Sequence, residues 1–262
     1  MNLVKSEFRK LFYTRSVYGL TLGAIALAML STWPAAYAVE RTQNLLSGES
    51  LTNPQMVAGI YGKATSGYLF AIILGIIFMG NEYQNGMAIS TFLATPKRTK
   101  VLYAKLGVAA LAGVAMMVIS ELFGFLGAYI GLNKYTHAAL TSGALLSLIV
   151  AGIISGAVLA VMGVALGALI RNVRIATTGV VIWLGVIERL IVVFWTTGGK
   201  YLPSGLIVGM LNVKLDVKSV GRGLTIDTAN YFGVTTATLL LLAYAAVFAF
   251  LGIFTSLRRD VN

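Results

Sequence analysis

The stretch Gly80–Lys105 reads GNEYQNGMAISTFLATPKRTKVLYAK and forms a short polar island between two long apolar runs. Pro96 cannot continue a helix interior, because it lacks an N–H group and its ring clashes with the preceding turn. The stretch therefore predicts a short helix over Tyr83–Phe92, a break at Thr95-Pro96 and a basic entry into the next run. Such a helix between two spans is suited to docking a separate protein. The alternative is an ordinary solvated loop.

The composition around this island is that of a membrane protein. The chain has 262 residues, of which 58% are hydrophobic and 11% charged, and its mean hydropathy is +0.84. These values exclude an ordinary soluble domain. A net charge of +11 often indicates nucleic-acid binding, but here the cations lie at the ends of apolar runs, which indicates membrane topology and no nucleic-acid partner. We expect one all-α polytopic membrane domain over residues 1–262.

Six apolar runs predict six membrane spans. Their expected bounds are Val17–Ala38, Ser66–Gly80 with a start as early as Met56, Leu106–Leu132, Leu145–Ile170, Ala176–Trp195 and Phe232–Leu257. The first run ends in Ala36-Tyr37-Ala38 and also resembles a cleavable signal peptide, but it is longer than the apolar segment of such a peptide.

Residues 1–15 predict a basic amphipathic helix in the membrane interface. Its apolar face carries Val4, Phe8, Leu11 and Phe12, and the cations off that face are Lys5, Arg9 and Lys10. The cations would meet anionic headgroups, which makes membrane lipids expected partners. A plain basic leader before the first span is the alternative.

The positions of the basic residues favour a cytoplasmic location for both termini. With that orientation the cytoplasmic cations are Lys5, Arg9, Lys10, Arg15, Lys97, Arg98, Lys100, Lys105, Arg171, Arg174, Arg258 and Arg259. The external connection over residues 196–231 has a low density of cations. The absence of Cys and of N-glycosylation sequons suits a bacterial cell membrane.

The polar island carries a motif of the form E-x-x-x-G, a short apolar run, T-P-x-R and a lysine before the next span. The matching residues are Glu82, Gly86, Thr95, Pro96, Arg98 and Lys105. This pattern resembles permeases of the type-2 ABC exporter family, in which Thr usually follows the glycine where this chain has Met87. The likeness extends in outline over the whole chain, through its length, its basic N-terminal helix and its number of spans.

The resemblance implies a type V exporter arrangement with an N-terminal elbow helix over residues 1–15. It also implies two permeases, identical or not, with two ATPase subunits that hold ATP and magnesium. The chain would then be no enzyme by itself and would hold no cofactor. Members of the family export antibiotics, peptides, lipids and polysaccharides. The sequence does not identify which of these this chain would move.

The first coupling region implied by the resemblance covers residues 81–99. The residues expected to couple to the ATPase there are Glu82, Tyr83, Gly86, Phe92, Pro96 and Arg98. Glu82 is expected to favour the helix start through its charge. Topology places a basic turn on the same side, with Arg171 and Arg174 as a smaller second contact.

Nucleotide and metal sites are not indicated within the chain. The nearest approach to a phosphate loop is Gly198-Gly199-Lys200-Tyr201, where Tyr201 replaces the Ser or Thr that would hold magnesium. The chain has no Cys, and His137 is its single His, so neither thiolate nor His-cluster metal sites are expected.

Three ionisable residues, Glu121, Glu188 and Arg189, fall within predicted spans. Ionisable groups at such depth are costly and usually face a bundle interior or water. They could line a substrate path or gate, or Glu121 and Arg189 could form a structural pair that braces two spans. Nothing in the sequence selects proton coupling.

Two packing features leave alternatives open. The connection over residues 196–231 contains an apolar segment near Pro203–Leu211, too short to span, which predicts an interfacial or re-entrant helix that could act as an external lid.

Small residues recur four apart and could form either a dimer seam or contacts within one bundle. These pairs are Gly19/Gly23, Gly127/Gly131, Gly152/Gly156 and Gly163/Gly167.

Two other classes of function stay open from the sequence. One is a secondary transporter or channel driven by an ion gradient, with Glu121 and Glu188 as candidate ion sites. The other is a membrane anchor or sensor that transports nothing. Co-purification with an ATPase would separate these classes from an ABC permease.

Overall fold

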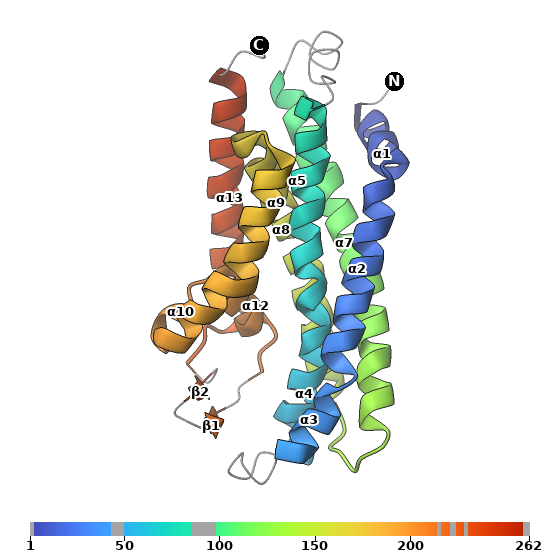
Figure 1. The fold of residues 1–262 in the computed structure, drawn as a ribbon, viewed down its shortest axis with the longest axis vertical. Coiled ribbons are helices and arrows are strands. Elements are labelled where there is room, and N and C mark those ends of the chain that lie inside the picture. The colour runs from blue at the N-terminus through green and yellow to red at the C-terminus, as the bar shows by residue number, and fades with distance from the viewer. Residues whose placement is uncertain are drawn as a thin grey trace.

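The structure is a computed structural model that describes residues 3–42, 50–84, 98–213, 216–220, 224–227 and 230–258. Long helices run along one common axis (Figure 1). In chain order the first half contains α1 (Leu3–Tyr13), α2 (Arg15–Thr32), α3 (Ala35–Thr42), α4 (Pro54–Gly62), the 3-10 segment η1 (Lys63–Gly67), α5 (Tyr68–Gln84) and α7 (Arg98–Leu132).

The second half begins with α8 (Ser142–Ile170) and α9 (Val173–Ile182). It continues with the π-helical segment η2 (Trp183–Ile187), α10 (Glu188–Phe194), α11 (Thr196–Gly199), α12 (Pro203–Met210) and α13 (Val234–Arg258). Two short strands, β1 (Asp216–Val220) and β2 (Leu224–Asp227), pair antiparallel before α13.

Six helical segments in the described part of the chain are long and apolar enough to cross a membrane, which confirms the six predicted spans. They are Arg15–Arg41, Pro54–Gln84, Lys100–Leu132, Ser142–Ile170, Val173–Val192 and Val234–Gly252. The second span is built from α4, η1 and α5, and the fifth from α9, η2 and α10. The predicted all-α class is confirmed, with one small hairpin added.

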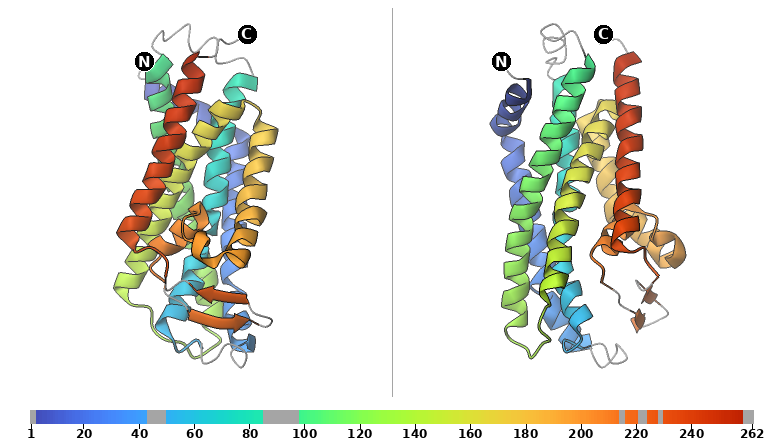
Figure 2. Two further views of the ribbon diagram at one scale, coloured as in Figure 1. Left: turned by 90° about the vertical axis from the view of Figure 1, so that its left-hand side faces the viewer. Right: turned by 180° about the vertical axis from the view of Figure 1, so that it is seen from behind.

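The first residues of α1 and the last residues of α13 lie at the same end of the bundle, called here the α1 end (Figure 1). The end of α5, the start of α7 and the turn between α8 and α9 lie toward this end as well. The two-stranded hairpin, α3 and α4 lie at the opposite end (Figure 2). Segments that flank the polar island therefore share one end with both termini.

Helix α8 forms the centre of the bundle and packs against α5, α7 and α13. It carries no charged residue and buries most of its small side chains. Its backbone approaches α5 closely, because a Cβ atom at Gly163 would overlap the carbonyl oxygen of Ile72, and one at Gly75 would overlap that of Ala160. Glycines at such contacts let helices approach at the backbone level.

Most glycines of the four recurring pairs pack within the chain. Gly152, Gly156, Gly163 and Gly167 all pack within the bundle. In the first span Gly23 faces the ring of Phe70, whereas Gly19 has open space beside it. Packing within one chain therefore accounts for the pairs of α8.

The ends of several helices follow from capping residues. Asn53 accepts a hydrogen bond from the Gln55 N–H at the start of α4, and Pro54 occupies the first turn. Arg171 ends α8 in the left-handed conformation with φ 54°, and the side chain of Asn172 then accepts from two N–H groups of α9. Two residues thus reverse the chain between two spans.

Two details of the polar segments differ from expectation. Helix α5 continues without a break through Gln84, so a separate helix that begins at Tyr83 is wrong. The remainder of that predicted helix, and Thr95-Pro96, lie outside the described residues. The hairpin was not predicted, whereas the structure does have a helix at Pro203–Met210.

Candidate functional site

Four charged side chains meet at the α1 end and are called here the charge cluster: Glu7, Lys10, Glu82 and Lys105. Lys105 Nζ lies 2.7 Å from Glu7 Oε2 and 3.1 Å from Glu82 Oε1. Lys10 Nζ lies 2.6 Å from Glu7 Oε1 and 2.8 Å from Glu82 Oε1. Each lysine therefore bridges both acids, and the cluster joins α1, the end of α5 and the first turns of α7.

Burial makes this cluster different from a surface ion pair. The side chains of Glu7, Lys105 and Glu82 are 0%, 1% and 4% exposed, and only Lys10 reaches solvent. Removing one partner from a buried pair costs about 3–5 kcal/mol, because the remaining charge is left uncompensated. The cluster is neutral as a whole, with two acids and two lysines.

The protonation of Glu7 and Lys10 follows from these contacts. Burial alone would raise the pKa of Glu7, but the charge of Lys105 and hydrogen bonds from both lysines outweigh it and lower the pKa. Burial alone would lower the pKa of Lys10, and its hydrogen bonds and charge contacts with Glu7 and Glu82 raise the pKa instead. Both groups therefore stay charged around neutral pH.

Glu82 lies in the last turn of α5, which corrects the expectation that it favours a helix start. An acid near a helix C-terminus is unfavourable by itself, because the exposed carbonyl groups there carry partial negative charge. Lys10 and Lys105 supply the compensating charge. Lys105 also lies 3.9 Å above the centroid of the Phe78 ring, a cation–π contact one turn earlier on α5.

The two segments expected to couple to an ATPase meet at this end. The guanidinium of Arg171 lies 5.0 Å from the centroid of the Tyr83 ring, so the α8–α9 turn contacts the end of α5. The Nε atom of Arg171 is buried and has no hydrogen-bond partner among the described residues. Arg174 is exposed on the first turn of α9.

The remaining expected coupling residues are only partly visible. Arg98 begins α7. Gly86, Phe92 and Pro96 lie outside the described residues. The described structure therefore fixes both flanks of the segment 85–97.

Glu121 lies on α7 in the interior of the bundle and is 3% exposed. Its carboxylate faces Gly152 of α8, where any added Cβ atom would collide with it. Among the described residues it makes no ion pair with Arg189, so the alternative of a structural brace between these two residues is wrong. Within the described residues no hydrogen bond reaches the Glu121 carboxylate.

Glu188 is fully buried and has a different set of partners. Its Oε1 accepts from the Trp183 indole Nε1 at 2.9 Å, and its Oε2 accepts from the Ser204 backbone N–H at 3.1 Å. Ser204 lies in the first turn of α12, so the carboxylate caps the N-terminus of that helix. The next residue, Arg189, is exposed. Glu188 thus ties α12 to the fifth span.

The segment that approaches a phosphate loop is used for packing. Gly198 and Gly199 belong to α11, and both are buried, against the Trp195 ring and the side chains of Val192 and Tyr231. In the part of the chain that the structure describes, no group of three His, Asp or Glu side chains is placed to hold a metal ion.

Sequence reasoning missed Glu7 and the burial of Lys105, although one signal was present. Val4, Glu7, Phe8 and Leu11 follow the i, i+3, i+4, i+7 spacing of one helix face. An acid at the second place of an otherwise apolar face indicates a buried charge that needs a cation. The cation comes from a residue 98 positions away, which helix periodicity cannot show.

Comparisons with known proteins bear on the identity of the chain. No curated protein matches it. Residues 3–188 match the model of a family described as ABC-2 family transporter protein, and these residues include α1, the charge cluster and the first five spans up to Glu188. With six membrane-spanning helices and a match over more than half of its length, the chain belongs to the ABC-2 transporter family of membrane permeases.

Proposed function

We propose that this permease is the membrane subunit of an ATP-driven exporter in a bacterial cell membrane. A separate ATPase subunit would bind ATP and magnesium, and the permease would move a drug-, peptide- or lipid-like substrate outward. Family membership supports the permease role. The charge cluster is the observation that carries the coupling role.

The proposed orientation places the α1 end in the cytoplasm. Lys5, Arg9, Lys10 and Arg15 lie on α1 or at the start of α2, and Arg171 and Arg174 lie at the α8–α9 turn of the same end. Such an accumulation of cations beside span ends favours the cytoplasmic side. The segment 85–97 would then be reachable by a cytoplasmic ATPase.

The charge cluster gives a mechanical route from this segment into the bundle. Glu82 precedes the segment and Lys105 follows it, and both are held to Glu7 and Lys10 of α1. A displacement of the segment by the ATPase would therefore move α5, α7 and α1 as one unit. Arg171 on the Tyr83 ring would pass the same movement to α8 and α9.

The opposite end supplies a candidate lid. Helix α12 is largely buried against α13 and α8 and is held through Ser204 by Glu188. In the proposed cycle α12 lies at or within the outer leaflet and moves when the substrate leaves. We propose that two such permeases, identical or different, pair around the substrate path, with Glu121 and Glu188 near it.

The test uses the purified permease and its ATPase, reconstituted in liposomes. Lys10→Met removes one bridge of the charge cluster, and Lys134→Met removes an exposed lysine at the opposite end as a matched control. We expect Lys10→Met and Gly86→Trp to reduce stimulation of ATP hydrolysis by the permease at least several-fold, with unchanged membrane insertion, and Lys134→Met to match the parent.

Equal stimulation in all three variants would contradict the coupling role of this end. If no ATPase co-purifies and transport follows an ion gradient alone, the exporter proposal is wrong. Cysteine labelling fixes orientation independently: a cysteine at Thr99 should be labelled only from inside, and cysteines at Ser47, His137 and Ser219 from outside.

A further inference from the structure

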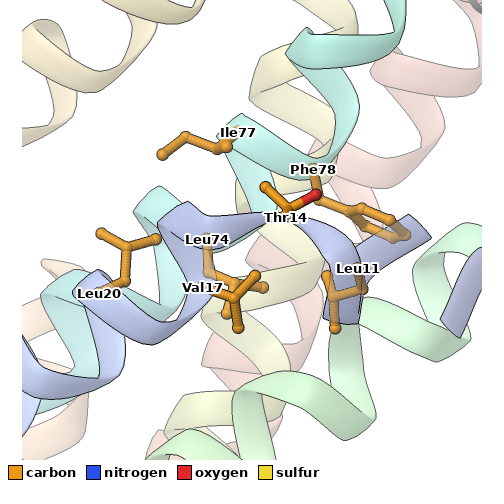
Figure 3. Close-up of a pocket in the computed structure, with 7 residues that line it drawn as sticks. All are labelled: Leu11, Thr14, Val17, Leu20, Leu74, Ile77 and Phe78. Carbon is orange, nitrogen blue, oxygen red and sulfur yellow. The ribbon is translucent and has the colours of Figure 1, made fainter. Parts of the chain in front are cut away.

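A shallow apolar hollow lies between the junction of α1 and α2 and the face of α5 (Figure 3). Leu11, Val17 and Leu20 line one side, and Leu74, Ile77 and Phe78 line the other. Leu11, Leu74 and Phe78 are themselves buried, whereas Val17, Leu20 and Ile77 are partly exposed. The hollow therefore has an apolar floor and an open side.

The hollow offers no free polar group to a ligand. Its single polar lining residue is Thr14, and the Thr14 hydroxyl already donates to the carbonyl oxygen of Lys10 at 2.8 Å. A polar or ionic substrate would lose its hydration there without gaining a hydrogen bond. A hydrocarbon chain has no hydrogen bonds to lose there.

The hollow lies at the depth of the upper acyl chain. The first span begins at Arg15, directly after Thr14, so the junction of α1 and α2 marks the surface of the hydrocarbon region. Leu20 lies five residues further, which is about 7.5 Å at 1.5 Å per residue. The hollow thus runs from the headgroup level into the first methylene groups of one leaflet.

Three exposed cations lie on the helices that border the hollow. Lys5, Arg9 and Arg15 are exposed, and none of them pairs with an acid in the described parts of the chain. Arg15 directly follows Thr14 of the lining, and Lys5 and Arg9 lie on the same helix as Leu11. The nearby acids, Glu7 and Glu82, are already engaged by Lys10 and Lys105. The field at this level is therefore positive and favours an anionic headgroup.

We propose that the hollow binds one acyl chain of an anionic phospholipid, whose phosphate meets the cations of α1 and the start of α2. The bound chain packs on Leu11 and Phe78, which also stand directly beneath the charge cluster: Leu11 is one turn after Glu7, and Lys105 lies over the Phe78 ring. Occupancy therefore supports α1 in its docked position. The proposal needs no ATPase and no transport.

The acyl-chain part is tested on the purified permease alone. Leu20→Trp fills the hollow, and Leu22→Trp places the same side chain on the same helix at a position that is 66% exposed. Lipid retained in native mass spectrometry is compared after adding phosphatidylglycerol. We expect Leu20→Trp to lose the most tightly held lipid, with at least a tenfold weaker apparent affinity, and Leu22→Trp to keep it. Ile77→Trp fills the hollow from α5 if Leu20→Trp does not fold.

The headgroup part uses phosphatidylglycerol and phosphatidylcholine with identical chains. The parent should prefer phosphatidylglycerol. The double variant Arg9→Gln with Arg15→Gln should reduce that preference by at least tenfold, because each cation near an anionic surface contributes about 1 kcal/mol to binding. Inorganic phosphate alone should not raise the melting temperature. Equal binding of both lipids, or equal loss in Leu20→Trp and Leu22→Trp, would overturn the proposal. A phosphate effect without a lipid effect would reassign the site to a free anion.

Discussion

The buried acids at the α1 end and those deep within the spans are held in different ways. Glu7 and Glu82 are each bridged by two lysines, so their charges are cancelled by other charges. Glu188 is held by the indole of Trp183 and the backbone of Ser204, which are neutral dipoles. Glu121 lies beside Gly152 of α8 and accepts no hydrogen bond from a described residue.

This difference separates fixed parts of the molecule from parts that can move. The charge cluster holds α1, α5 and α7 together, because the departure of any one of these helices would leave a buried charge without its partner. A carboxylate held by dipoles can exchange those bonds for water at a smaller cost. We therefore expect the α1 end to move as a rigid unit and the α12 end to open more easily.

The largest effect is expected from Lys105→Met. The change leaves Glu7 and Glu82 with Lys10 alone in a buried site, and it should lower the free energy of unfolding by about 3–5 kcal/mol. Denaturant titration in detergent measures it. The double variant Glu7→Gln with Lys105→Met should recover much of the loss. If the loss in the double variant equals the sum of the losses in Glu7→Gln and Lys105→Met, the two residues are not coupled. The contrast between the buried acids of the α1 end and those of the spans then disappears.

A smaller loss is expected from Glu188→Ala. It removes two hydrogen bonds to a charged acceptor, each worth about 1.5–3 kcal/mol, and uncaps α12. The variant no longer buries a charge, which offsets part of this loss, so the free energy of unfolding should fall by about 1.5–3 kcal/mol. Exposure of a cysteine introduced at Val208 of α12 reports whether the helix is released. Glu188→Gln keeps an acceptor oxygen and should lose less. An unchanged labelling rate in Glu188→Ala would show that α12 is held by packing alone.

The pH dependence of stability should come from the charge cluster. Because the pKa of Glu7 is lowered, its contribution is present above its ordinary value of 4.5 and is lost as pH falls further through the folded-state pKa. Because the pKa of Lys10 is raised, its contribution is present below its ordinary value of 10.5 and is lost as pH rises through the folded-state pKa.

Melting temperature measured across this range should therefore show a plateau with losses at both extremes. The double variant Glu7→Gln with Lys10→Met should flatten both losses. We expect these pH-dependent losses of stability to be smaller than the loss caused by Lys105→Met, because a protonated Glu7 keeps part of its hydrogen bonding. Losses of the same size in the parent and the double variant would assign the dependence to other groups.

The smallest effect on stability is expected from Glu121→Gln. The amide has the size of the carboxylate, and no hydrogen bond or ion pair to a described residue is removed, so the free energy of unfolding should change less than in Glu188→Ala. Ser120→Ala is the control, because it removes the 3.1 Å hydrogen bond to the Ala24 carbonyl. Lost transport with unchanged stability would place Glu121 on the substrate path.

Much of the architecture was readable from the sequence. Hydropathy predicted all six spans, because a bilayer requires long uninterrupted apolar helices. The amphipathic spacing of residues 3–13 and the Pro203 signal each coincide with a helix in the structure. Periodicity works for these elements because each depends on neighbouring residues.

The sites were less readable, because they depend on contacts between distant segments. Glu82 was expected to act locally at a helix start, but its partners are Lys10 and Lys105. A Glu121–Arg189 pair was one of two alternatives drawn from depth alone, and depth carries no information on which face of a span is turned inward. The paired strands Asp216–Val220 and Leu224–Asp227 were missed because they are short and lie in a connection that was interpreted from its apolar helix alone.

The docking of α1 depends on segments of the chain that are synthesised later. Glu7 and Lys10 lie three residues apart and can pair as soon as α1 forms, but Glu82 is 72 residues after Lys10 and Lys105 is 98 residues after Glu7. At about 5–20 residues per second, α1 stays without its distant partners for on the order of 5–20 s. The first two spans therefore enter the membrane before α1 docks, and the emergence of α7 completes the assembly of this end.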